Sequence, residues 1–94
     1  LVAPNFSLGA VMMMKVSAEL APYFPNVEII ELHHNHKYDA PSGTAILTAK
    51  LINDSKQAAK VTADEDLTRE SLPGARGAKV DDVTIHSVRL CIIC

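Results

Sequence analysis

Apolar residues recur at helical spacing near the start of the chain. The pattern predicts a helix from Leu8 to about Ala21, and its apolar positions follow at four-residue intervals: Leu8, Met12, Val16 and Leu20. The opposite side is also apolar or small, so we expect this helix to be covered on more than one side. Pro22 should end it, because the residue before a proline disfavours helical geometry.

A second helix is predicted from Gly43 to about Lys56, with Ser42 as its N-cap. Its buried side is expected to carry Leu47 and Leu51, with Ala45, Ala49 and Ile52 alongside.

Two segments rich in β-branched residues predict strands, Val27 to Leu32 and Val83 to Leu90. Residues 60 to 82 are dense in charge and contain proline and glycine, which favours a long surface loop. The order helix, strand, helix, strand indicates an α+β or α/β layer. Two strands alone rarely make an adequate sheet, so we expect further partners.

Composition narrows the classes of function. The 94 residues are 48% hydrophobic and 21% charged, which suits one small domain over residues 1–94. A net charge of −2 and 4% aromatic residues argue against nucleic acid as a partner. The longest apolar run is too short for a membrane helix and no secretory leader is visible, so no membrane partner is expected.

Of the 4 histidines, His33, His34 and His36 gather beside Lys37, where the first predicted strand ends. Imidazole exchanges protons near neutral pH, and neighbouring cations or burial lower the pKa of a lysine ammonium. A few residues later, Ser42 to Thr44 opens the second helix, whose free amides and dipole favour an anion. The stretch therefore fits a small anionic substrate held near proton-transfer groups.

Other interpretations of the same residues stay open. On a strand, His34 and His36 point to one face and His33 to the other, so two metal ligands could share a face. His86, Asp39 or the terminal Cys91–Cys94 pair would have to complete such a site. The cysteine spacing is also that of a redox motif. The simplest alternative is a solvated histidine cluster followed by an ordinary helix cap.

Residues 31–45 read Glu-Leu-His-His-Asn-His-Lys-Tyr-Asp-Ala-Pro-Ser-Gly-Thr-Ala. This stretch resembles the signature of the 4-hydroxy-tetrahydrodipicolinate reductases, also called dihydrodipicolinate reductases, approximately E-x-H-H-x-x-K-x-D-A-P-S-G-T-A. Residues 3–9 resemble the loop by which that family enters its substrate domain. Residues 74–77 and 85–90 resemble a later loop and strand of the same domain.

The resemblance implies reduction of a cyclic unsaturated dicarboxylate with NADPH or NADH, in lysine and diaminopimelate biosynthesis in the cytoplasm. It implies His33 as proton donor and acceptor and Lys37 as proton donor. The implied substrate-binding residues are His34, Ser42, Gly43 and Thr44. The nicotinamide end of the cofactor would be lined by Ala3, Pro4, Asn5 and Phe6. No metal is implied.

The resemblance also implies a fold: an α+β substrate-binding and oligomerisation domain with a mixed β-sheet packed with helices, which assembles as a homotetramer. The family's Rossmann half is absent from the sequence, and Cys91–Cys94 stands where the family continues with Pro-Gly. We therefore expect little or no reductase activity from this chain alone. The alternative function is a non-catalytic metal- or anion-binding module that uses the histidine cluster.

Overall fold

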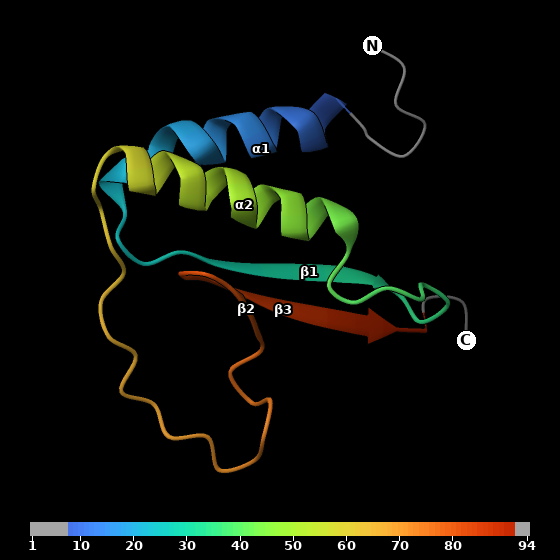
Figure 1. The fold of residues 1–94 in the computed structure, drawn as a ribbon. Coiled ribbons are helices and arrows are strands. Elements are labelled where there is room, and N and C mark those ends of the chain that lie inside the picture. Colours follow the sequence, from blue (N-terminus) through green and yellow to red (C-terminus); the bar gives the residue numbers. More distant parts are fainter. Residues whose placement is uncertain (1–7, 92–94) are drawn as a thin grey trace.

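A mixed three-stranded sheet carries two helices on one face (Figure 1). The computed structural model describes residues 8 to 91. Its elements, in chain order, are α1 (Leu8–Leu20), the short 3-10 helix η1 (Ala21–Tyr23), β1 (Glu28–His34), α2 (Gly43–Ala58), β2 (Ala78–Val80) and β3 (Val83–Leu90). Neither α-helix has the length and apolar character that crossing a membrane requires. The α+β class expected from the sequence is confirmed.

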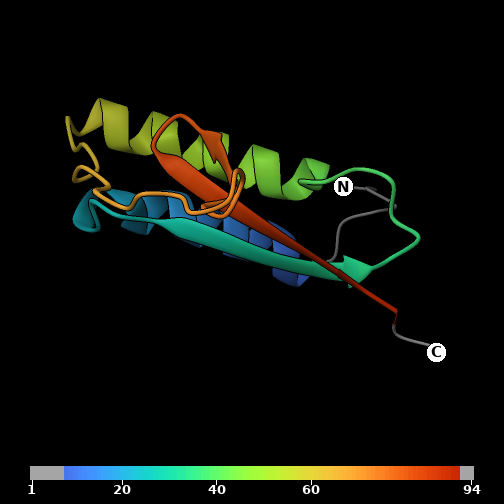
Figure 2. The ribbon, with the colours of Figure 1, turned by 90° about the horizontal axis from the view of Figure 1, so that it is seen from below.

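The strand order is β1-β3-β2, with β3 parallel to β1 and antiparallel to β2. Figure 2 shows β1 and β3 running in the same direction, with α1 behind β1. A parallel pair needs a crossover connection, and α2 supplies it between β1 and β3. The register pairs Glu31 with Ser87 and His33 with Arg89, so these four side chains share one face of the sheet.

The core lies between α2 and the sheet and consists of Ala21, Ala45, Ala49, Ile52, Val83 and Ile85. The prediction that Leu47 and Leu51 are buried is wrong, since they are 41% and 36% exposed. Ala45, Ala49 and Ile52 follow one another at four- and three-residue steps and form the buried stripe. Leu47 lies two residues from Ala45 and Ala49, about 200° around the helix, and therefore faces outward.

Polar side chains on the buried side of α2 tie the helix to its surroundings. Lys56 is 1% exposed, and its Nζ donates to the carbonyl of Pro25. Asn53 Nδ2 donates to the Val80 carbonyl at 2.7 Å, which joins α2 to β2. Each contact gives the polar side chain of a buried residue a hydrogen-bond partner.

The predicted elements are largely confirmed, with two differences. The first helix is α-helical to Leu20 and continues as η1, which contains Pro22. The segment predicted as a loop over residues 60–82 contains β2, a strand of only three residues that no hydrophobic alternation marks. The far face of the sheet carries exposed apolar residues: Ile30 at 68%, Leu32 at 64% and Leu90 at 59% exposure.

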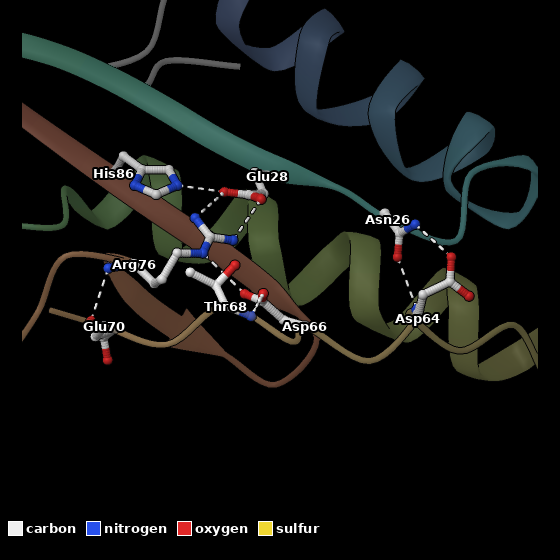
Figure 3. Close-up of polar contacts among 8 residues, drawn as sticks. All are labelled: Asn26, Glu28, Asp64, Asp66, Thr68, Glu70, Arg76 and His86. Atoms are coloured by element: carbon white, nitrogen blue, oxygen red, sulfur yellow. Dashed lines mark hydrogen bonds and ion pairs between the residues drawn. The ribbon is translucent and has the colours of Figure 1, made fainter.

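Arg76 anchors the long α2–β2 connection to β1 (Figure 3). Its guanidinium donates two hydrogen bonds to Glu28, at 3.2 and 2.9 Å, and one to Asp66 at 3.0 Å. Arg76, followed by His86 from β3, lowers the pKa of Glu28 to about 2. Near the start of the connection, the Asn26 side chain donates to Asp64 at 2.8 Å.

Candidate active site

The carboxyl end of β1 places consecutive histidines on opposite faces of the sheet. Exposure alternates along the strand, so Glu31 and His33 face the helices and His34 faces away. The His34 Nδ1 accepts the His36 amide at 3.1 Å, and the two rings lie 6.1 Å apart. His33 is therefore the histidine that the fold directs toward α2.

The start of α2 opens beside this strand end (Figure 1). Ser42 has extended dihedral angles, and its Oγ accepts the Ala45 amide at 3.2 Å, which confirms Ser42 as the N-cap. The first-turn amides of an α-helix have no partner inside the helix and carry its positive dipole end. Gly43 and Thr44 lie in this turn, so they provide donors suited to a carboxylate.

Glu31 connects the strand to the helix start. Its Oε2 accepts the Ser42 amide at 3.0 Å and lies 3.6 Å from His33 Nε2. Its Oε1 forms an ion pair with Arg89 Nη1 at 2.5 Å. Burial raises the pKa of Glu31, but Ser42 and Arg89 outweigh it and bring the pKa down to about 2.

Lys37 lies in the turn between β1 and α2. Its Nζ is 3.1 Å from Asp39 Oδ1, and Lys37 is the largest cause of the lowered pKa of Asp39. The Asp39 carbonyl accepts a hydrogen bond from Arg89 Nη2 at 2.7 Å. The turn that carries Lys37 is thus tied to β3.

A largely apolar groove of about 880 Å³ runs between α1, α2 and β1. His33, Ser42 and Thr44 line it, so the fold brings three of the sequence-predicted residues into one shared cavity. Lys37, His34 and Gly43 lie outside its lining. Residues 3–6, expected to contact the cofactor, lie outside the described part of the chain.

The metal interpretation gains no support. Within residues 8–91, no three histidine, cysteine or acidic side chains come together as a metal site would require. Cys91 is disulfide-bonded, so it offers no thiolate to a metal.

Residues 9–94 match the sequence model of the family described as "Dihydrodipicolinate reductase, C-terminus". The chain belongs to this family. It is 61% identical over 93 residues to the 4-hydroxy-tetrahydrodipicolinate reductase of Streptococcus gordonii and 56% identical over 90 residues to that of Dictyoglomus turgidum. In both comparisons the match covers 96% of this chain and 34% of the relative. This chain therefore spans about a third of the length of these relatives.

A solved member of the dihydrodipicolinate reductase family has the same fold. The structure is "Dipicolinate bound Dihydrodipicolinate reductase from Paenisporosarcina sp. TG-14", with a TM-score of 0.83 and 52% identity. The match covers 97% of this chain and 34% of that one. The family membership expected from residues 31–45 is thus confirmed, together with the fold.

Sequence reasoning gave no role to Glu31 or Arg89, although the two form an ion pair that contacts the signature segment, Glu31 at Ser42 and Arg89 at Asp39. Glu31 shares a strand face with His33, and this alternation was a usable signal. Arg89 is 58 residues beyond Glu31, and only the parallel register brings it beside His33. Its position could be found only after β1 and β3 were known to pair.

Proposed function

We propose that the chain forms the substrate-binding part of a 4-hydroxy-tetrahydrodipicolinate reductase. The enzyme would reduce 4-hydroxy-tetrahydrodipicolinate to tetrahydrodipicolinate with NADPH or NADH in lysine and diaminopimelate biosynthesis. The observation that carries the proposal is the groove shared by His33, Ser42 and Thr44, with an imidazole beside an anion-binding helix start. The dipicolinate bound by the Paenisporosarcina relative supports a small dicarboxylate as substrate.

In this proposal, one substrate carboxylate docks on the first turn of α2. The amides of Gly43 and Thr44 donate to it, and the Ser42 and Thr44 hydroxyls add further donors. His34 is the fourth substrate-binding residue by family resemblance. Because its ring lies on the other face of the sheet, that role requires the ring to turn toward the groove.

His33 acts as proton donor and acceptor, and Lys37 as proton donor. A bound nicotinamide supplies the hydride, and Ala3, Pro4, Asn5 and Phe6 are the proposed residues along it. Proton delivery by His33 as the substrate is reduced keeps negative charge from accumulating on the substrate ring. The ammonium of Lys37 also attracts the dicarboxylate, since opposite charges steer association.

We also propose that the intact protein is a cytoplasmic homotetramer. The exposed apolar side chains of Ile30, Leu32 and Leu90 on the far sheet face support a contact with a second copy.

Dipicolinate (pyridine-2,6-dicarboxylate) tests the proposed site without requiring turnover. Titration followed by calorimetry and amide NMR should show saturable binding, with the largest shifts at Gly43 and Thr44. Lys37→Ala should weaken binding at least about tenfold, the loss of one charge-assisted contact. Lys50→Ala removes the same charge from an exposed position of α2 and should bind like the unmodified chain. Binding that is absent, or equally weakened by both substitutions, would contradict the proposal.

A further inference from the structure

One ion pair joins the segments that surround the catalytic end of the groove. Glu31 comes from β1 and Arg89 from β3, and their side chains are only 9% and 17% exposed. The carboxylate also accepts the Ser42 amide at the start of α2. Arg89 in turn donates to the Asp39 carbonyl in the turn that carries Lys37. The pair therefore contacts every segment that supplies a proposed site residue among residues 33–44.

The position of Glu31 Oε2 is the decisive detail. This single oxygen accepts the Ser42 amide at 3.0 Å and lies 3.6 Å from His33 Nε2. It therefore lies between the imidazole and the helix start. At 3.6 Å its contact with His33 is an ion-pair distance, longer than a hydrogen bond, and such contacts in ligand-free enzymes often tighten when substrate binds.

We propose that Glu31 is a positioning residue that fixes the distance between the His33 ring and the carboxylate-binding start of α2, with Arg89 as its counter-cation. This inference rests on the proposed function. Glu31 faces the Nε2 side of the ring, which leaves Nδ1 to exchange a proton with the substrate. When the imidazolium gives up its Nδ1 proton, the Nε2–H bond stays intact, and Glu31 remains a carboxylate throughout.

Arg89 neutralises the negative charge that Glu31 places beside the groove. A buried carboxylate at the end of a groove would repel a dicarboxylate ligand, since like charges disfavour one another at short range. The guanidinium cancels that charge, and its second nitrogen restrains the Lys37 turn. A lysine at this position would keep the charge but lose the planar fork that reaches both partners.

The tautomer of His33 tests the geometry in the unmodified, ligand-free chain. Ring ¹⁵N NMR above the titration range should show a stronger preference for the Nε2–H tautomer at His33 than free histidine has, since that tautomer is already the main one in water. In Glu31→Gln the preference should weaken, because an amide accepts a hydrogen bond less strongly than a carboxylate. A preference at His33 no stronger than that of free histidine would overturn the inference, and this measurement needs no variant to fold.

Ligand affinity provides the second readout. Glu31→Gln and Arg89→Lys should each weaken dipicolinate binding by about tenfold, while circular dichroism shows a retained fold. Loss of a negative charge would by itself strengthen binding of a dianion, so the sign for Glu31→Gln separates positioning from simple electrostatics. Arg76→Lys is the matched control, because Arg76 pairs with Glu28 at the other end of β1. This control should leave affinity within about twofold of the unmodified chain.

The outcomes separate the two proposals. If the unmodified chain binds dipicolinate and both Glu31→Gln and Arg89→Lys bind equally well, the positioning role is refuted and the function stands. If no form binds dipicolinate but the His33 tautomer follows Glu31, the proposed function fails and the local geometry stands. If the unmodified chain does not bind dipicolinate and the His33 tautomer does not respond to Glu31→Gln, both are overturned.

Discussion

Gly77 and Gly74 form a matched pair for measuring how closely the α2–β2 connection approaches the sheet. Both have positive φ, +74° for Gly77 and +86° for Gly74, a region that L residues rarely adopt. A Cβ added at Gly74 meets nothing within 4 Å. A Cβ added at Gly77 would lie 2.6 Å from the Ile85 carbonyl oxygen and 2.9 Å from His86 Nδ1.

These distances give different costs for the same substitution. Gly74→Ala should lower the free energy of unfolding by about 1–2 kcal/mol, the cost of left-handed geometry for an L residue. Gly77→Ala carries the same cost plus the clash with a strand carbonyl, which cannot rotate away as a side chain can. Overpacking of this kind adds about 1–3 kcal/mol. We therefore expect Gly77→Ala to cost about 2–5 kcal/mol.

Urea and thermal unfolding followed by circular dichroism measure the difference. In a domain of this size each kcal/mol lowers Tm by about 4–8 °C, so the two variants should be clearly resolved. Asparagine tolerates left-handed geometry, so Gly74→Asn should recover much of the loss at that site, whereas Gly77→Asn should not. Equal losses for Gly74→Ala and Gly77→Ala would refute the reasoning, because only Gly77 faces the strand.

Three further sets of substitutions test the core, the helix cap and the buried carboxylate. Ile52→Ala, at a 2% exposed position, should lower the free energy of unfolding in urea by about 2–5 kcal/mol, whereas Leu47→Ala should lower it by less than about 1 kcal/mol. The reverse order would support the sequence-based prediction that Leu47 is buried. Ser42→Ala should cost about 0.5–2 kcal/mol, because the Ala45 amide loses its acceptor, and Ser42→Asn, which keeps an acceptor, should recover most of it. Glu31 has a folded pKa of about 2 against an ordinary 4.5, so its stabilisation is complete above pH 4.5 and is lost as the pH falls through about 2. The free energy of unfolding should fall by on the order of 3 kcal/mol from this group, and the Glu31→Gln variant should lack this fall. If the free energy of unfolding of Glu31→Gln falls as steeply with pH between 4.5 and 2 as that of the unmodified chain, the reasoning is contradicted.

The sequence predicted those elements whose signal is local. The helices from Leu8 and from Gly43, and the strand Val83–Leu90, follow from periodicity, a capping serine and β-branched residues. On α2, the predicted burial of Ala45, Ala49 and Ile52 is confirmed, whereas that of Leu47 and Leu51 is wrong. The structure buries alanines there because they let the helix approach the sheet closely, and the side chain of Lys56 occupies part of the interior. The strand Ala78–Val80 depends on pairing with β3, which no local pattern encodes.

In the candidate site too, some residues have a local signal in the sequence and others depend on long-range pairing. His33, Lys37 and Ser42–Thr44 come from one contiguous stretch, and in a βα unit the helix begins close to the carboxyl end of the strand before it. Local reasoning could therefore find them together. Arg89 reaches the site only through the register that sets it opposite His33, so the charge that neutralises Glu31 comes from a distant part of the sequence. A one-residue slip between β1 and β3 would turn the guanidinium to the far face and leave a buried carboxylate unpaired, at a cost of several kcal/mol. The Glu31–Arg89 pair thus specifies the strand register as well as the geometry of the site.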